Sequence, residues 1–132
     1  MPSTSPTYSR GKTITLWILQ ILVGVLFIAA GGMKLAGVPM MVEIFDHIGF
    51  GQWFRYVTGI VELAGGILLL MPRTALFGAA MMIATMACAV CTHLLLIGGS
   101  PVPAAILLIL SAVILWLRRQ QVSVLVARAT AS

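Results

Sequence analysis

Four long apolar segments, nearly free of charged side chains, constrain this chain more than any other feature. They cover residues 14–35, 53–71, 76–97 and 101–117 of the 132-residue sequence. At a rise of about 1.5 Å per residue, helices of these lengths roughly match a hydrocarbon layer about 30 Å thick. Only helices and closed barrels satisfy their backbone hydrogen bonds in lipid, and these segments lack the alternation of barrel strands. The sequence therefore predicts an all-α, membrane-embedded four-helix bundle.

The composition excludes an ordinary soluble domain. Hydrophobic residues make up 61% of the chain and charged residues 8%, whereas soluble domains have about 45–50% apolar and about 25% charged residues. The net charge of +5 does not indicate a nucleic-acid partner. The basic residues flank the apolar segments and do not form a patch with exposed aromatic residues. We expect the lipid bilayer to be the main surroundings of the chain.

The positions of the basic residues predict how the spans are oriented. If both termini are cytoplasmic, six of the eight Lys and Arg residues lie on the cytoplasmic side, and Lys34 and Arg55 lie outside. An excess of Lys and Arg marks the cytoplasmic side of a membrane protein. We therefore expect a flexible cytoplasmic tail at residues 1–13, a four-span domain at 14–117 and a second cytoplasmic tail at 118–132.

The segment between the first two spans predicts a short amphipathic helix that lies on the outer membrane surface. Pro39 precedes this segment and Gly49 follows it, as is typical of a helix start and a helix end. Its apolar and polar residues fall largely on different faces, as in interfacial helices. The apolar residues are Met41, Ile44, Phe45 and Ile48, and the polar residues are Glu43, Asp46 and His47.

Glu62 lies near the middle of the second span, where it needs a physical explanation. Insertion scales place the cost of an acidic residue at this depth at about 2.5–3.5 kcal/mol, unless the residue faces the protein interior. Helical spacing puts Arg55, Gly59 and Gly66 on the same face as Glu62. Glycines allow a neighbouring helix to approach closely, and Gly31 supplies a matching position on the first span. We therefore expect Glu62 to face a packed helix interface.

The lean of side chains along a helix selects the partners of Glu62. Side chains tilt toward the N-terminus of their own helix, so Glu62 leans outward, while Lys34 and His93 lean inward from the spans on either side. Lys34 is the preferred partner and Arg55 the second. Two interpretations stay open: a structural ion pair that fixes helix register, or an interior site for a quinone headgroup, a proton or a small polar ligand.

The stretch "CAVCTH" at residues 88–93 does not form a haem or metal motif. Covalent haem attachment requires His directly after the second Cys, and Thr92 stands between them. Cys88 and Cys91 share a helix face that does not include His93, so three ligands cannot converge and we expect no metal site. A redox role for Cys88 and Cys91 is a further hypothesis. A disulfide relay needs a second cysteine pair, which this sequence lacks, so we expect packing residues.

Three features together resemble the DoxX-like membrane proteins: "GGMKLAG" at the end of the first span, "GIVELAGGILLLMP" in the second, and His93 at the end of the third. The resemblance extends from about Leu16 to Leu117. It implies a small, multi-pass protein of four helices in the bacterial inner membrane. Some members of the family belong to thiosulfate:quinone oxidoreductase, and others to membrane complexes that handle oxidative stress with redox partners. The C-x-x-C motif is not expected of the family.

Three functions are compatible with these residues. The first is an accessory membrane subunit that contacts quinone and works with a soluble or membrane redox partner, without being an enzyme on its own. The second is a transporter or proton-coupled permeability element built around Glu62, which requires a homo-oligomer because four helices form a thin conduit. The third is a structural or assembly protein in which Lys34 and Glu62 only lock the packing.

Overall fold

The computed structural model describes residues 10–119, 127 and 130. In this part of the chain there are five α-helices and no strand, which confirms the all-helical prediction. The helices are α1 (Arg10–Ala36), α2 (Pro39–Ile48), α3 (Gln52–Leu70), α4 (Ala75–Thr92) and α5 (Val102–Leu117), and a short π-helix (His93–Ile97) continues α4. Most of the two expected tails lies outside the described residues, although α1 already begins at Arg10.

Three of these helical stretches are long and apolar enough to cross a membrane: Thr13–Ala36, Gln52–Leu70 and Ala75–Ile97. The third combines α4 with the π-helix. The apolar helix α5 is shorter, with 16 residues. The chain is therefore a membrane protein, with apolar helices close to the places that the sequence predicts.

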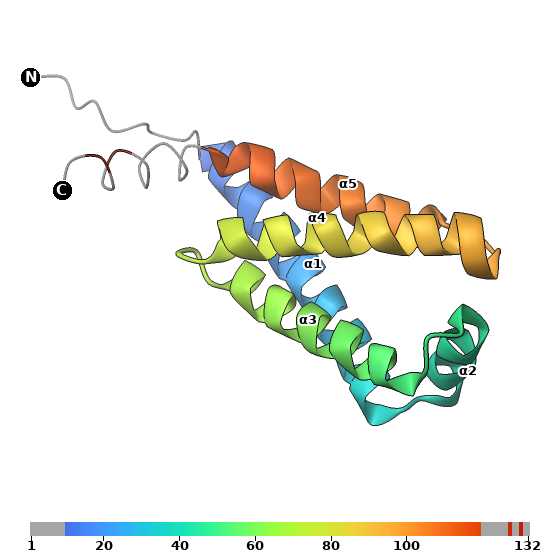
Figure 1. Cartoon of the computed structure of the whole chain (residues 1–132). Coiled ribbons are helices and arrows are strands. Elements are labelled where there is room, and N and C mark those ends of the chain that lie inside the picture. The colour runs from blue at the N-terminus through green and yellow to red at the C-terminus, as the bar shows by residue number, and fades with distance from the viewer. Residues whose placement is uncertain (1–9, 120–126, 128–129, 131–132) are drawn as a thin grey trace, which may run out of the picture.

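The helices associate as two pairs. Helix α1 packs along α3, and α4 packs along α5; contacts between α3 and α4 and between α1 and α5 join the pairs. Helix α1 begins and α5 ends at one end of the molecule, near the turn between α3 and α4, while α2 lies at the opposite end (Figure 1). Between these ends, α3 and α4 are close together near their turn and farther apart toward α2 (Figure 1).

Glycines bring α1 and α3 into backbone contact. A Cβ atom at Gly31 would lie 2.7 Å from the carbonyl oxygen of Gly59, and a Cβ at Gly66 would lie 2.8 Å from the carbonyl oxygen of Gly24. Distances this short leave no room for a side chain at either crossing. The three glycines predicted to serve packing therefore lie in one interface, and Gly24 is a fourth member.

A second close contact joins α3 to α4 near their turn. A Cβ at Gly78 would lie 2.7 Å from the backbone nitrogen of Leu69, and Gly65 lies against the side chain of Met82. The core continues from this contact through side chains that are fully or almost fully buried: Val23, Phe27, Leu69, Met82 and Ile114. The tight packing between α3 and α4 is thus concentrated toward the end opposite α2.

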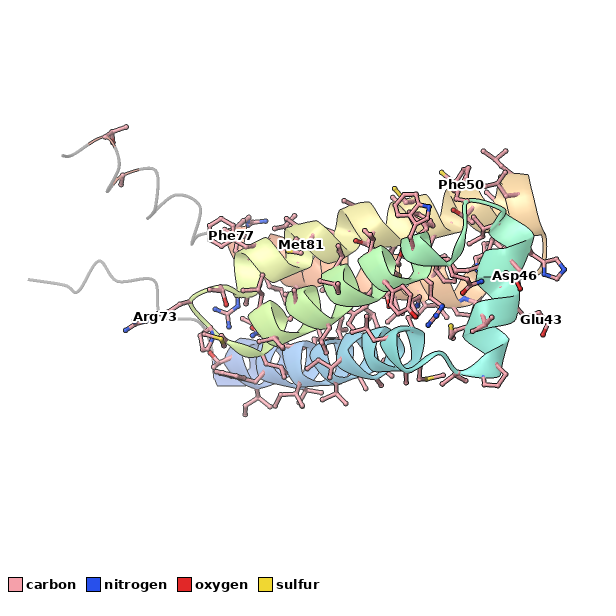
Figure 2. The ribbon with its side chains drawn as sticks, turned by 60° about the horizontal axis from the view of Figure 1, so that its bottom comes forward. Glu43, Asp46, Phe50, Arg73, Phe77 and Met81 are labelled. Atoms are coloured by element: carbon pink, nitrogen blue, oxygen red, sulfur yellow. The ribbon has the colours of Figure 1, made fainter. Side chains whose placement is uncertain are left out.

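Helix α2 is the expected short helix between the first two spans. Gly37, with φ of 72°, lets the chain turn out of α1, and Gly49, with φ of 86°, ends α2 in the left-handed conformation. The buried ring of Phe45 packs edge-to-face on Phe54 of α3, with ring centroids 5.8 Å apart. The exposed residues Glu43 and Asp46 lie at this end of the molecule, far from Arg73 and Phe77 at the other (Figure 2).

Candidate functional site

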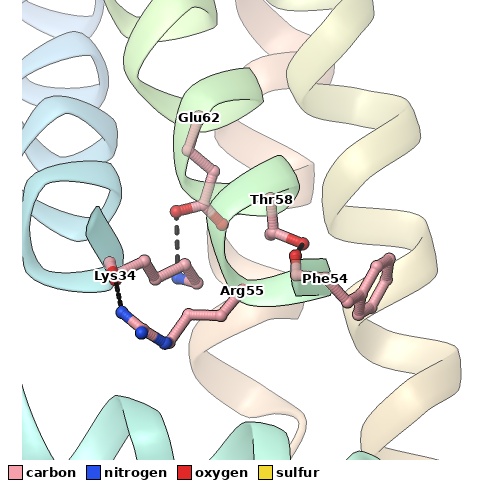
Figure 3. Close-up of polar contacts among 5 residues, drawn as sticks. All are labelled: Lys34, Phe54, Arg55, Thr58 and Glu62. Atoms are coloured by element: carbon pink, nitrogen blue, oxygen red, sulfur yellow. Dashed lines mark hydrogen bonds and ion pairs between the residues drawn. The ribbon is translucent and has the colours of Figure 1, made fainter. Parts of the chain in front are cut away.

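Lys34 and Glu62 form an ion pair between α1 and α3. The Lys34 Nζ atom lies 2.9 Å from Glu62 Oε2, and the exposed fractions of the two side chains are 13% and 4%. Lys34 belongs to the last turn of α1, and Glu62 projects from the middle of α3 (Figure 3). The close packing of glycines brings the two side chains within reach of each other. A Cβ atom at Gly59 of α3 would lie 3.1 Å from the Cβ of Lys34, so α3 passes directly beside this residue.

Arg55 is buried near this pair but does not bind the carboxylate. Its Nη1 donates to the backbone carbonyl oxygen of Lys34, and its Nε donates to Gln52 Oε1 at 2.7 Å (Figure 3 shows the first contact). The last carbonyl groups of a helix have no partner within the helix, so Arg55 supplies one for α1. Gln52 in turn donates to Asp46 Oδ1 at 2.7 Å, which connects the same network to α2. Arg55 thus acts on Lys34 through its backbone.

His93 borders the same interior space without touching the ion pair. It is the first residue of the π-helix, and its Nδ1 lies 3.2 Å from the carbonyl oxygen of Gly98. The sequence places Lys34, Glu62 and His93 around one region, and the structure puts all three in the wall of one cavity. The histidine ring, however, is held by Gly98, directly after the π-helix.

This space, the central cavity, has a volume of about 470 Å³. Small-molecule sites are commonly clefts of about 300–1,000 Å³ with mainly apolar walls and few polar groups. The central cavity fits this description, because apolar side chains from every α-helix line it together with the ion pair. They include Phe27, Ile44, Phe45, Phe54, Val57, Val61, Met86 and Leu107; the polar lining residues are Lys34, Glu62, Thr58, Thr85, Thr92 and His93, with Cys88.

The ion pair retains hydrogen-bonding capacity toward the cavity. A lysine ammonium group has three N–H donors, and one of them donates to Glu62. The second carboxylate oxygen, Oε1, accepts no hydrogen bond from any residue that the structure describes. Thr58, one helical turn before Glu62, donates its hydroxyl hydrogen to the Phe54 carbonyl oxygen at 2.8 Å and keeps its acceptor lone pairs. The site can therefore both donate and accept hydrogen bonds.

The two cysteines occupy different environments. Both are free thiols at exposed positions on α4, and Cys88 lines the central cavity whereas Cys91 does not. Within the described part of the chain, no three residues among His, Cys, Asp and Glu are placed to hold a metal ion. Cys88 and Cys91 therefore form neither a disulfide nor a metal site in this structure, and Cys88 alone of the two belongs to the candidate site.

A second buried polar cluster lies at the opposite end of the helices and was not among the predicted site residues. Gln20 is fully buried and donates from Nε2 to the Leu69 carbonyl oxygen at 2.9 Å. Arg118, just after α5, donates from Nε to Gln20 Oε1 at 2.6 Å. A lone glutamine within the first span was the signal available in the sequence. The sequence alone does not identify the partner of Gln20, because Arg118 is 98 positions away and reaches it only through the packing of α5 on α1.

Comparisons with known proteins show the family of the chain. The model of the DoxX-like family matches residues 18–118. An uncharacterized protein of Bacillus subtilis (strain 168), YdgD, is 36% identical over 50 residues, which correspond to 38% of this chain and 44% of that protein. The chain therefore matches less than half of the length of this relative. No solved structure matches significantly.

Proposed function

The chain belongs to the DoxX-like family, and from this premise we propose that it is a small membrane subunit that binds a lipophilic molecule with a polar headgroup, a quinone, at Lys34 and Glu62. One observation carries the proposal: a buried ion pair with unused donors and an unused acceptor oxygen borders an apolar cavity of about 470 Å³. An ion pair that served packing alone would need no such space beside it, since interiors are ordinarily close-packed.

The chemistry of the pair suits a quinone headgroup. A quinone carbonyl oxygen accepts hydrogen bonds, and the ammonium group of Lys34 has N–H donors to spare. Reduction of the ring to a quinol adds two electrons and two protons, and a carboxylate next to the carbonyl oxygen is suited to passing a proton. In this proposal a soluble or membrane redox partner supplies the two electrons, and Glu62 relays the two protons one after the other, taking each from the aqueous phase and passing it to a carbonyl oxygen of the ring. The chain itself is an accessory subunit.

We further propose that α1, α3, α4 with the π-helix, and α5 form a four-helix bundle across the bacterial inner membrane, with both termini cytoplasmic. The distribution of charge supports this orientation. Arg73, Arg118 and Arg119 lie at the end where α1 begins and α5 ends, and the acidic residues Glu43 and Asp46 lie at the α2 end (Figures 1 and 2). Basic residues favour the cytoplasmic side, so α2 would lie on the outer surface.

Binding of a quinone to the purified protein in lipid nanodiscs tests the proposal. We expect a tail-less, fully substituted benzoquinone to bind saturably in isothermal titration calorimetry. The double substitution Lys34→Met with Glu62→Leu should weaken binding at least about tenfold, because it removes the polar contacts without leaving a lone buried charge. Arg73→Met, at the opposite end, is the matched control and should bind like the wild type.

Two outcomes would contradict the proposal: absence of saturable binding to the wild type, or wild-type affinity in the double variant. A thermal unfolding curve for each variant shows whether it is folded. If the double variant is unfolded, Glu62→Gln provides the second measurement. It keeps the size of the side chain and removes the charge that holds the Lys34 ammonium group in the cavity wall, so it should also lower quinone affinity.

A further inference from the structure

The two helix pairs enclose the central cavity where they separate. Near the turn between α3 and α4, Gly78 packs on the backbone of Leu69 and Gly65 packs on Met82, so this part of the α3–α4 interface is closed. Toward α2, the facing residues of α3 and α4 line the cavity and do not fill it: Val57, Thr58, Val61 and Glu62 on α3, and Thr85, Met86, Cys88, Ala89 and Thr92 on α4.

Helix α2 covers the wide end of the central cavity. Its apolar face contributes Met41, Ile44, Phe45 and Ile48 to the cavity wall, and Phe45 is anchored on Phe54 of α3. Gln52 also ties α2 to the start of α3, because its Nε2 donates to the Val42 carbonyl oxygen at 3.0 Å. A direct path along the helix axes from this end is therefore obstructed by a packed helix.

Exposed lining residues on α3 and α4 indicate that the cavity reaches the surface between these two helices. Val57 on α3 is 44% exposed and Cys88 on α4 is also exposed, although both line the cavity. On the α1–α5 side the lining residues Phe27 and Ala104 are buried. Pro103, which is exposed, belongs to the first turn of α5 at the α2 end. We call the gap between Val57 and Cys88 the α3–α4 opening.

We infer that the ligand enters the central cavity sideways from the bilayer through the α3–α4 opening, and that it is a single-tailed lipid whose tail stays in this opening while its headgroup reaches Lys34 and Glu62. The inference rests on the proposed function and specifies the class and route of its ligand. The opening lies between two membrane-spanning helices, so the surface outside it is the hydrocarbon region. Lys34 and Glu62 suit a polar headgroup inside the cavity, and the α3–α4 opening suits an apolar tail. Because α2 covers the aqueous end, the arrangement favours a molecule with one headgroup and one apolar tail.

Substitutions that fill the opening test the inference. Val57→Trp and Cys88→Trp each place a large ring in the opening from one of its two sides. Each variant has a matched control on the same helix: Ile60→Trp, at a position that is 57% exposed, and Cys91→Trp, also at an exposed position. Neither control residue lines the cavity. Binding of a tail-less quinone and of the corresponding long-tailed quinone is measured for all proteins in nanodiscs.

The tail in the opening predicts a difference between the two ligands. In Val57→Trp and Cys88→Trp, the affinity for the long-tailed quinone should fall at least about tenfold more than the affinity for the tail-less quinone. Both affinities should stay at wild-type values in Ile60→Trp and Cys91→Trp.

Equal losses for the two ligands, or wild-type affinity for the long-tailed quinone in both filled variants, would overturn the inferred route. That result is distinct from failure of the proposed function, in which the tail-less quinone does not bind the wild-type protein at all. Two independent filled positions keep the test valid if one variant does not fold.

Discussion

Arg55 donates a hydrogen bond to the backbone carbonyl oxygen of Lys34, while the side chain of Lys34 donates to Glu62. The two cations, Arg55 buried and Lys34 mostly buried, thus have different tasks. Arg55 fastens the end of α1 to α3, and Lys34, at the end of α1, directs its ammonium group toward the carboxylate in the middle of α3. The position of Lys34 in the wall of the central cavity depends on this attachment.

Replacing Arg55 with methionine should therefore disturb the site from a distance. The variant loses the hydrogen bonds to Lys34 and Gln52, and we expect the free energy of unfolding to fall by about 1–3 kcal/mol. Quinone affinity should fall as well, because the end of α1 is released. Unfolding in mixed micelles measures the change in stability, and calorimetry measures the change in quinone affinity. Arg73→Met removes an exposed arginine and should change neither; a stable Arg55→Met with full affinity would disprove the attachment.

Removing one member of the ion pair should destabilise the protein more than removing both. Glu62→Leu leaves Lys34 without its partner in a mostly buried position, and breaking a buried pair in this way typically costs about 3–5 kcal/mol. Lys34→Met combined with Glu62→Leu places two apolar side chains in contact and should be much closer to the wild type. A double-mutant cycle from unfolding titrations measures the coupling. Additive effects of the two single changes would argue that the pair contributes no coupling.

Alanine at Gly31 should separate α1 from α3. Its Cβ would lie 2.7 Å from the Gly59 carbonyl oxygen, so the helices must move apart, at a cost of about 1–3 kcal/mol for an overpacked contact. Gly32→Ala is a matched control one position away, because no atom of a neighbouring helix lies within 4 Å of a Cβ built there. Thermal unfolding of the two variants should differ clearly. Similar melting temperatures would mean that the interface accommodates a methyl group.

Two buried polar side chains should respond to substitution in opposite ways. Gln20→Leu removes the group that joins the Leu69 carbonyl oxygen to Arg118, and we expect a loss of about 1–3 kcal/mol. The hydroxyl of Ser111 is buried without a hydrogen-bond partner among the described residues. Ser111→Ala removes an unsatisfied polar group and should be neutral or stabilising. Unfolding measurements that rank the two variants in the reverse order would contradict the described network.

Much of the candidate site was predictable from the sequence. A carboxylate in the middle of an apolar segment needs a cation from another helix, and the lean of helical side chains pointed to Lys34. The same reasoning ranked Arg55 as a second partner for Glu62, but in the structure the guanidinium group turns to the end of α1 instead. The last carbonyl groups of a helix lack partners within that helix, so they compete with Glu62 for the hydrogen bonds of Arg55. Helical spacing relates residues on one face of the second span, and it does not show the end of another helix.

The sequence by itself determined where the apolar helices lie, that the chain is a membrane protein, and which residues face the α1–α3 interface, because hydropathy and the helical period are properties of single segments. Only the tertiary structure decided that the two helix pairs separate toward α2, that a cavity with an opening between Val57 and Cys88 results, and that Gln20 meets Arg118. These features depend on the angle between the helix pairs. Close contacts between α3 and α4, such as Gly65 with Met82 and Gly78 with the backbone of Leu69, set that angle.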